Sequence, residues 1–297
     1  MERRFLKIII STSLLITSCQ QIPLNESNRN FVNDNIDKQN LVIDLKKQEK
    51  IISYHSDIWS YILINSTYIS DSLDEQTLMY MNRHLQDLDK FKEFLNDSYY
   101  FMFFVIEELE NAKLPIELAF LPYIESNYDP FSISSSGAVG MWQFMPRTGR
   151  TYDLERSWWN EDRHDPFKST SAAIKYLKYL YDRFDQDLHL TLAAYNAGPS
   201  FLDRQIKRNQ RRGLNTDYWS LDLPIQTRNY VPKFIAIKEL IINSDQYDIE
   251  LPFIPYEPVV AKIEIPGQVE ILTLSEYLNI KPELLYKLNA GYTKWAS

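Results

Sequence analysis

The stretch LPYIESNYDPFSISSSGAVGMWQFMP, Leu121 to Pro146, holds a single glutamate, Glu125, at the end of an apolar run. A turn rich in serine and glycine follows it, and then a tryptophan–glutamine pair. Pro115 suits the first turn of a helix, whereas Pro122 interrupts the hydrogen-bond ladder a few residues later. The sequence therefore predicts that Glu125 lies near an irregular helix end, beside apolar side chains.

Apolar surroundings disfavour the charged form of a carboxyl group, so we expect the pKa of Glu125 to be raised. A carboxylic acid that is still protonated near neutral pH can donate its proton to a glycosidic oxygen. A solvent-exposed glutamate at a helix end would have the same local sequence, so this residue alone does not establish the chemistry. Most enzymes that cut sugar chains use two carboxylates, which raises the question whether one can suffice.

The chain as a whole has 297 residues, enough for one large domain or two modest ones. Hydrophobic residues make up 44% of it, enough for a core, and aromatic residues make up 14%. Its 7 glycines form neither a G-x-G-x-x-G pattern nor a Walker motif, which argues against a phosphate-binding loop. The net charge of −8 argues against nucleic acid as a partner, because phosphates would be repelled.

The N-terminus has the features of a secretory leader, with positive residues followed by an apolar run too short to span a bilayer. The tetrapeptide Ile16-Thr17-Ser18-Cys19 resembles a bacterial lipobox. We therefore expect residues 1–18 to be a lipoprotein signal peptide and Cys19 to be lipidated, giving a membrane anchor. Gln20 after the cysteine resembles outer-membrane lipoproteins of Gram-negative bacteria. The alternative is an ordinary secretory signal.

Helical periodicity predicts an all-α fold from residue 41 onward. The expected helices cover 41–94 with a second one over 74–95, then 101–111, 169–184, 187–197, 227–243 and a hairpin over 273–289. Ser169 and Thr170 are the expected N-cap of one helix and Asp187 that of the next, which Gly198 ends.

Four motifs lie in order between residues 94 and 244. They are ELAFLPYIES (117–126), SGAVGMWQFMP (136–146), AAYNAG (193–198) and TRNYVPK (227–233). Together they resemble the motifs of the membrane-bound lytic murein transglycosylase D group, in the superfamily of soluble lytic transglycosylases and goose-type lysozyme. The resemblance implies a lysozyme-like helical domain that cuts the MurNAc–GlcNAc β-1,4 bond of peptidoglycan.

The same resemblance implies an answer to the single carboxylate. Glu125 protonates the leaving oxygen, and the N-acetyl group of the same sugar stabilises the carbon C1. Glu125 then acts as a base on the C6 hydroxyl of that sugar, which closes onto C1. The product is a 1,6-anhydro sugar, and no water is consumed.

The domain plan that follows from the resemblance has five parts. They are a signal peptide (1–18), a polar linker (19–40), a helical N-terminal extension (41–95), the catalytic domain (96–245) and a proline-rich connector with a small helical C-terminal segment (246–297). Longer members of the group continue into LysM wall-binding repeats, and the sequence contains no complete LysM repeat.

Positions in the first two motifs suggest further substrate-binding residues. Ser126 could orient the acid or the sugar, or could cap the helix end. Ser134 could contact the acid or the C6 hydroxyl, or could be a turn hydroxyl. Gln143 is expected to hydrogen-bond an N-acetyl or sugar oxygen. Met145 could cover the acid as an apolar lid, or could belong to the core.

The third and fourth motifs supply the other expected contacts. Tyr195 and Asn196 end a helix that faces the cleft, although asparagine before a helix stop is also a simple C-terminal signal. Tyr230 is expected to donate its hydroxyl to Glu125, the alternative being a core tyrosine. Relatives commonly have glutamate where this chain has Gln226, so the charge of that residue is missing here.

Other residues are less specific. Trp142, Trp158 and Trp159 could stack on sugars, but packing is the expected role of at least two of them. His164 has no ligand partner at metal-binding spacing, and the only cysteine is Cys19, so we expect no metal and no cofactor.

Two alternatives remain open at this stage. A hydrolytic muramidase of the goose-type lysozyme kind would need a second carboxylate to hold water, for which Asp129, Asp153 and Asp162 are available. A peptidoglycan-binding lipoprotein without activity could keep the same fold.

Overall fold

The computed structural model describes residues 5–9, 57–66, 73–264 and 270–294. Most of these residues are helical, in agreement with the expected fold class. Cys19, the linker over 19–40 and residues 41–56 lie outside the described residues.

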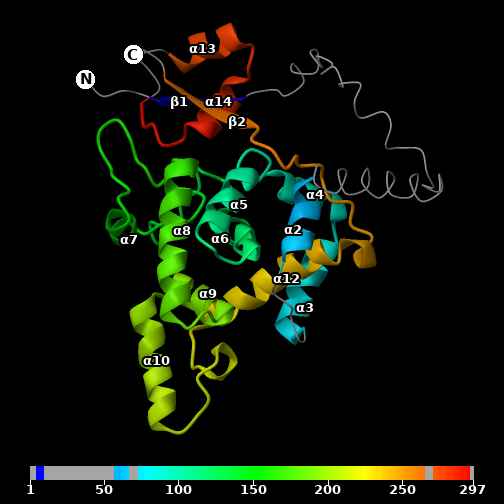
Figure 1. Ribbon diagram of the computed structural model, residues 1–297, viewed down its shortest axis with the longest axis vertical. Helices are drawn as coiled ribbons and strands as arrows, with labels where there is room; N and C mark the ends of the chain where they lie inside the picture. Colours follow the sequence, from blue (N-terminus) through cyan, green and yellow to red (C-terminus); the bar gives the residue numbers. More distant parts are fainter. Residues whose placement is uncertain (1–4, 10–56, 67–72, 265–269, 295–297) are drawn as a thin grey trace, which may run out of the picture.

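The helices follow one another with short connections (Figure 1). The α-helices are α2 (Ile58–Asn65), α3 (Glu75–Leu85), α4 (Leu88–Asn96), α5 (Met102–Asn111), α6 (Leu121–Ser126), α7 (Pro146–Thr151), α8 (Pro166–Arg183), α9 (Leu188–Ala197), α10 (Pro199–Arg211), α11 (Ile225–Arg228), α12 (Tyr230–Ile242), α13 (Ile271–Leu278) and α14 (Pro282–Leu288). The 3₁₀ helices are η3 (Ile116–Phe120), η4 (Tyr218–Ser220) and η5 (Ser244–Tyr247).

Helix α12 is central to the packing, because it contacts α3, α6, α9 and η3. Figure 1 shows α10 projecting from one end of the molecule, while α13 and α14 lie at the opposite end. The core between them is aromatic and aliphatic, and Phe120, Trp142 and Phe234 are fully buried in it. Burial of such large side chains supplies most of the favourable free energy of folding.

Several predicted elements are confirmed. The Asp187 side chain accepts a hydrogen bond from the Leu190 N–H and caps α9, which ends at Gly198. Helix α5 and the hairpin of α13 and α14 lie where periodicity placed them. These signals are local, so they could be read without tertiary information.

The predicted N-cap of α8 is wrong. The helix begins at Pro166, and the Asp165 carboxylate accepts hydrogen bonds from the N–H groups of Phe167 and Lys168. Proline is favourable in a first turn because its missing N–H needs no partner there. The hydroxyls of Ser169 and Thr170 instead bond back to the carbonyls of Asp165 and Pro166 within the helix.

Two predicted helices are each divided into two. The Asp87 side chain accepts from the Lys90 N–H and starts α4, so that 74–95 is not one helix. Residues 227–243 divide at Asn229, which ends α11 and precedes α12. Helices α7 and α10 were not predicted from the sequence.

Strand β1 (Phe5–Ile9) pairs antiparallel with β2 (Val260–Glu264), with Lys7 opposite Lys262. Residues 1–18 were expected to be a signal peptide outside the fold, so this pairing was not expected. A short apolar run with β-branched residues suits a strand as well as the apolar part of a leader. Cleavage after residue 18 stays a prediction, and it would remove β1.

Candidate active site

Glu125 lies in the last turn of α6 and is half-buried. The chain changes from the 3₁₀ helix η3 to α6 just before Pro122, which sits in the first turn of α6. Asn127 ends the helix in the left-handed conformation, at φ 59°. The irregular helix end predicted from the two prolines is therefore present, and the next residue, Ser126, bonds the 131–145 loop.

Burial raises the pKa of Glu125 from its usual 4.5 to about 7. Two groups on α12 act in the opposite direction: the Tyr230 hydroxyl donates a hydrogen bond to Oε1 of Glu125, and the charge of Lys233 is nearby. Burial and the negative charge of Glu125 raise the pKa of Tyr230 well above its usual value, so this phenol keeps its proton. The predicted contact of Tyr230 with the acid is present.

The C-terminal end of α9 contributes the next two predicted residues. The Tyr195 hydroxyl donates to the Trp142 carbonyl at 2.8 Å, and the pKa of Tyr195 is raised by burial and by the charge of Glu125. Asn196 accepts a hydrogen bond from the Thr227 hydroxyl at 2.9 Å through Oδ1. This bond leaves the Nδ2 of Asn196 as a donor, and it links α9 to α11.

Gln143 lies in a tight loop, with its backbone at φ 49°. Its Nε2 donates to the carbonyls of Gly140 at 2.9 Å and Ser132 at 3.3 Å. The amide group is therefore oriented by the loop itself, and these bonds do not use its Oε1. The loop packs closely, since a Cβ on Gly140 would lie 1.9 Å from the Arg163 carbonyl oxygen.

The two predicted serines, Ser126 and Ser134, form hydrogen bonds to backbone groups of the loop. The Ser126 hydroxyl donates to the Met141 carbonyl at 2.8 Å and joins the end of α6 to the loop. The Ser134 hydroxyl accepts from the Ala138 N–H and bonds the Ser136 hydroxyl, both at 2.9 Å, as a turn hydroxyl does. Met145 is 42% exposed, which places it at the surface beside α7 and outside the core.

Fewer of the three tryptophans are buried than expected. Trp142 is fully buried, and its Nε1 donates to the Thr170 hydroxyl at 2.8 Å. Trp158 and Trp159 are 72% and 43% exposed, so only one of the three packs in the core. Both exposed residues belong to a turn between α7 and α8, a place that sequence periodicity does not reveal.

Sequence reasoning missed Arg163, which lies behind the loop. Its guanidinium pairs with the buried Glu161 at 2.9 Å and donates to the carbonyls of Phe144 and Gly137 at 3.0 and 3.3 Å. These bonds hold both ends of the SGAVGMWQF segment. The available signal was a charged residue 17 positions after the second motif and two before the Asp165-Pro166 pair.

Among the described residues, no carboxylate is one of the groups that shift the pKa of Glu125. Asp129 and Asp153 are exposed. Asp162 is buried and paired with Lys168 at 2.7 Å. Over the described part of the chain, no group of three or more His, Cys, Asp or Glu side chains is placed to hold a metal ion. No described helix is long and apolar enough to cross a membrane.

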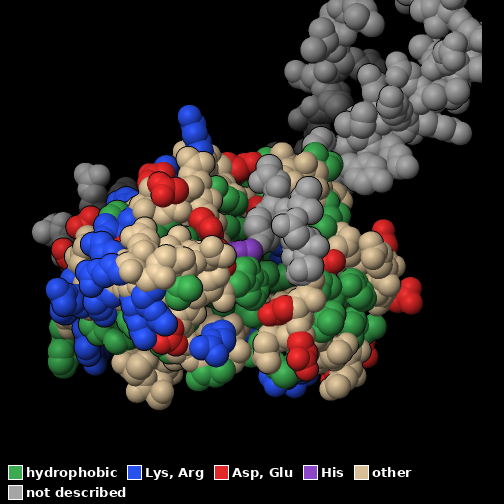
Figure 2. Space-filling view, turned by 90° about the horizontal axis from the view of Figure 1, so that it is seen from below, with side chains coloured by type: hydrophobic (Ala, Val, Ile, Leu, Met, Phe, Trp, Pro, Cys, Tyr) green, Lys and Arg blue, Asp and Glu red, His purple; other side chains and the backbone are tan. Residues whose placement is uncertain are grey.

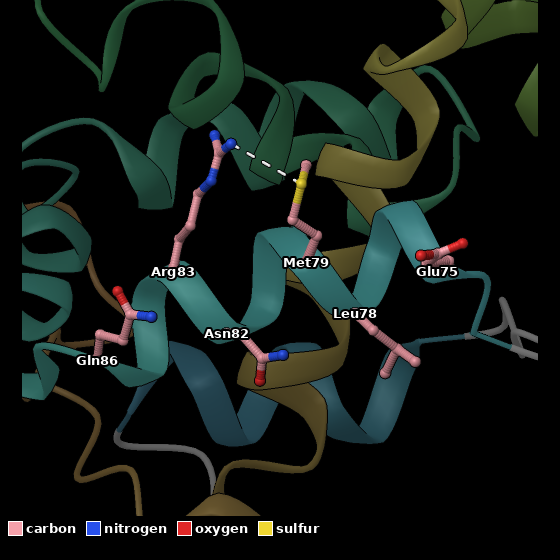
Figure 3. Close-up of a pocket in the computed structure, with 6 residues that line it drawn as sticks. All are labelled: Glu75, Leu78, Met79, Asn82, Arg83 and Gln86. Atoms are coloured by element: carbon pink, nitrogen blue, oxygen red, sulfur yellow. Dashed lines mark hydrogen bonds between the residues drawn. The ribbon is translucent and has the colours of Figure 1, made fainter.

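A hollow of about 510 Å³ lies along one face of α3 (Figure 3). Its lining comes from Glu75, Leu78, Met79, Asn82, Arg83 and Gln86, and it includes none of the predicted site residues. None of the residues that line this hollow is a buried titratable group, so the hollow is not a good candidate for a catalytic site. The candidate site is therefore the cluster around Glu125.

Residues 103–217 match the family model described as Transglycosylase SLT domain. The chain is 33% identical over 247 residues to membrane-bound lytic murein transglycosylase D of Escherichia coli (strain K12), which covers 81% of this chain and 53% of the relative. It is 32% identical over 108 residues to membrane-bound lytic murein transglycosylase F of Pseudomonas fluorescens (strain Pf0-1), covering 34% of this chain and 21% of that relative.

Among solved structures, the chain is similar to the 70 kDa soluble lytic transglycosylase of Escherichia coli, with 17% identity and a TM-score of 0.40. That similarity covers 59% of this chain and 31% of the other. The chain spans about half the length of the first of these relatives.

Proposed function

We propose that the chain is a peptidoglycan lytic transglycosylase, on the premise that residues 103–217 match the Transglycosylase SLT domain. It cleaves the MurNAc-β-1,4-GlcNAc bond without water and leaves a 1,6-anhydroMurNAc end. The observation that carries the proposal is one half-buried carboxyl group with a pKa of about 7, hydrogen-bonded by Tyr230, with no carboxylate among the described groups that shift its pKa.

The first step is protonation of the leaving oxygen. With a pKa of about 7, a large fraction of Glu125 is protonated at neutral pH and can act as a general acid. As the glycosidic bond breaks, positive charge develops at C1 of the MurNAc sugar. The N-acetyl oxygen of the same sugar neutralises that charge, so no protein carboxylate is needed there.

The second step uses the same group as a base. The Glu125 carboxylate, stabilised by the Tyr230 hydroxyl and the Lys233 charge, takes the proton of the C6 hydroxyl. The C6 oxygen then bonds to C1 and closes the anhydro ring. The proton given in the first step is recovered in the second, so the enzyme returns to its starting state.

The other predicted residues bind the glycan in this proposal. The Oε1 of Gln143 accepts hydrogen bonds from N-acetyl N–H or hydroxyl groups of the glycan. The Nδ2 of Asn196 donates to N-acetyl or hydroxyl oxygens. Tyr195 and Met145 supply contact surface beside the acid. Ser126 and Ser134 position α6 and the loop through their backbone bonds.

We also propose that the protein is an outer-membrane lipoprotein facing the periplasm, anchored through Cys19, with the domain plan given above. The lipobox-like sequence supports this, and so do relatives named as membrane-bound. In a Gram-negative host, lipid labelling of the expressed protein should disappear on Cys19→Ser substitution. Labelling that persists would contradict the anchor.

The test of activity is mass spectrometry of muropeptides released from purified sacculi. Wild-type protein should release anhydro products, which are lighter by one water than the products of hydrolysis. A muramidase would release the hydrolysis products. Glu125→Gln should lower the rate by about 10²–10⁴, the usual contribution of a general acid. Asp129→Asn, a change at an exposed carboxylate, is the control and should leave the rate unchanged. Equal clearing by wild type and Glu125→Gln would favour a protein that binds the wall without cutting it.

A further inference from the structure

Helix α10 carries a concentrated positive charge in a chain of net charge −8. Residues 199–212 contain five cations and a single carboxylate. Arg204, Lys207, Arg208 and Arg211 recur at spacings of three and four, which places them on one side of the helix. All four are exposed, and together they form what we call the basic face of α10.

Most of this charge is not neutralised within the described part of the protein. Arg208 pairs with Asp222 at 3.1 Å. Asp203 pairs with Arg183 of α8 at 2.5 Å, so it does not neutralise the basic face. Arg204 lies 5.7 Å from the centre of the Phe201 ring, and it forms no ion pair with a described carboxylate. The same is true of Lys207 and Arg211.

The basic face begins close to the candidate site. Gly198 ends α9 two residues after Asn196 and is also the residue before α10. Helices α9 and α10 pack against each other, and α10 projects from this end of the molecule (Figure 1). Figure 2 views that end and shows lysine and arginine side chains gathered on one side of it.

The position of α10 is held firmly. The Asn209 side chain is buried and donates to the carbonyls of Asn215 and Ser220, at 2.8 and 2.9 Å. The loop after α10 is thus tied to the helix, and it leads into α11, whose Thr227 bonds Asn196. A ligand that binds the basic face would therefore bind a helix whose position relative to the loop before α11 is fixed by hydrogen bonds.

We propose that the basic face of α10 binds the carboxylates of the peptide stems of peptidoglycan, which project from the MurNAc sugars of a strand held in the site. This inference rests on the proposed function. The stems are anionic substituents that repeat along the glycan, and a protein of negative net charge would otherwise repel them. A row of exposed cations on the helix that follows the Tyr195-Asn196 segment offsets that repulsion and favours glycan that carries stems over bare glycan.

The test compares two substrates and two matched variants. Arg204→Gln/Lys207→Gln/Arg211→Gln removes three charges from the basic face and leaves the Arg208–Asp222 pair intact, and glutamine keeps helix propensity. Lys90→Gln/Lys113→Gln/Lys281→Gln removes the same charge from exposed positions on other elements. The substrates are intact sacculi and glycan strands stripped of their peptides with an amidase.

On intact sacculi at limiting substrate, the α10 variant should form anhydro product about three- to tenfold more slowly than wild type, the effect of losing a few exposed ion pairs. On stripped strands the two rates should agree, which also shows that the variant is folded. Added salt at 0.5 M should remove the difference on sacculi, because exposed charges are screened. The control variant should match wild type on both substrates.

Equal losses on both substrates, or no loss on either, would overturn the proposal. A second result would also overturn it. If the α10 variant keeps the full rate on sacculi but no longer sediments with vesicles of phosphatidylglycerol and phosphatidylethanolamine, the basic face binds a membrane surface. Sedimentation with intact and stripped glycan is measured in parallel. If wild type forms no anhydro product, the proposed function fails, and a stem-dependent loss of sedimentation still decides whether the face binds stems.

Discussion

Glu125 shows how a single side chain acquires its chemistry from its surroundings. Burial raises its pKa to about 7, while the Tyr230 hydroxyl and the Lys233 charge prevent a larger rise. A group balanced in this way exchanges its proton near neutral pH, which suits an acid that must later act as a base. The direction of the shift was predictable from the apolar neighbours, and the contact with Tyr230 was expected from the fourth motif, but the contribution of Lys233 was not.

The raised pKa of Glu125 makes a prediction about stability. In the unfolded chain the carboxyl has its usual pKa near 4.5, so between about pH 4.5 and 7 the folded state binds more protons. Stability from this group is therefore full below pH 4.5 and is lost as pH rises towards 7. Glu125→Gln carries no charge at any pH, so at pH 8 it should be more stable than wild type by about 1 kcal/mol.

Thermal unfolding at pH 8 and pH 4.5 measures this difference. The melting temperature of Glu125→Gln should exceed that of wild type at pH 8 by a larger margin than at pH 4.5. A difference that does not change with pH would contradict the raised pKa. Catalytic rate should also fall as pH rises above 7, because the acid form is lost.

The Tyr230 hydroxyl stabilises the charged form of Glu125. Tyr230→Phe should therefore raise the pKa of Glu125 further, and the fall in rate at high pH should move to higher pH. At pH values below this fall, the rate of Tyr230→Phe should be about tenfold lower than that of wild type, because the Glu125 carboxylate is less well stabilised in the second step. Tyr176→Phe is the control, a buried tyrosine for which the described structure gives no hydrogen bond. An unchanged pH profile for Tyr230→Phe would remove its assigned role.

At the scale of elements, the loop over 131–145 depends on close backbone approach. Gly140 and Gly137 have similar backbone conformations, at φ 81° and φ 84°. They differ in space, since a Cβ on Gly140 would lie 1.9 Å from the Arg163 oxygen, whereas one on Gly137 would meet no atom within 4 Å. The two glycines are thus a matched pair for separating conformational strain from steric clash.

Gly137→Ala should cost about 1 kcal/mol, the strain of a left-handed residue with a Cβ. Gly140→Ala should cost a further 1–3 kcal/mol, because the loop must move away from Arg163. Denaturant unfolding measures both free energies of unfolding. Activity should fall more for Gly140→Ala, since Gln143 is held by the Gly140 carbonyl. Equal costs for the two variants would show that the loop yields easily.

Helix boundaries show which element signals are local. Asp187 and Gly198 were correctly identified as the limits of α9, because each acts through the backbone of its own turn. Ser169 and Thr170 were expected to cap α8, but Asp165 caps it, although all three have side chains that can cap a helix. The competition between neighbouring cap residues is decided by where the chain enters the helix, and packing sets that direction.

At the scale of the molecule, two buried groups of opposite charge lie on elements that pack against each other, Glu117 on η3 and Lys238 on α12. Burial lowers the pKa of Lys238, and the charges of Glu239 and Glu117 oppose that shift. The Ser66 hydroxyl of the residue after α2 also donates to Glu117, at 2.5 Å. Helix α12 is therefore attached to the segment that leads into α6 and Glu125.

Removing one partner of this pair should be costly. Glu117→Gln should destabilise the protein by about 1–3 kcal/mol, because the buried Lys238 would lose one of the two negative charges, Glu239 and Glu117, that favour its protonated form. The double variant Glu117→Gln/Lys238→Met should recover at least half of that loss. Chemical unfolding of the two variants and wild type measures the coupling. A double variant less stable than the single one would mean that the pair stabilises the fold in its own right.

The sequence by itself determined the helical class, the order of the four motifs, the irregular end of α6 and the direction of the Glu125 pKa shift. These depend on hydrogen bonds and side chains within a few residues of one another, so periodicity, proline and capping chemistry reveal them. Tertiary structure alone decided that Trp142 is buried while Trp158 is exposed, and that no described carboxylate shifts the pKa of Glu125. It also brought Arg163 to the carbonyls of Phe144 and Gly137, a contact that the sequence did not reveal. Such contacts depend on how whole helices pack, and packing is a property of the assembled core that no local stretch contains.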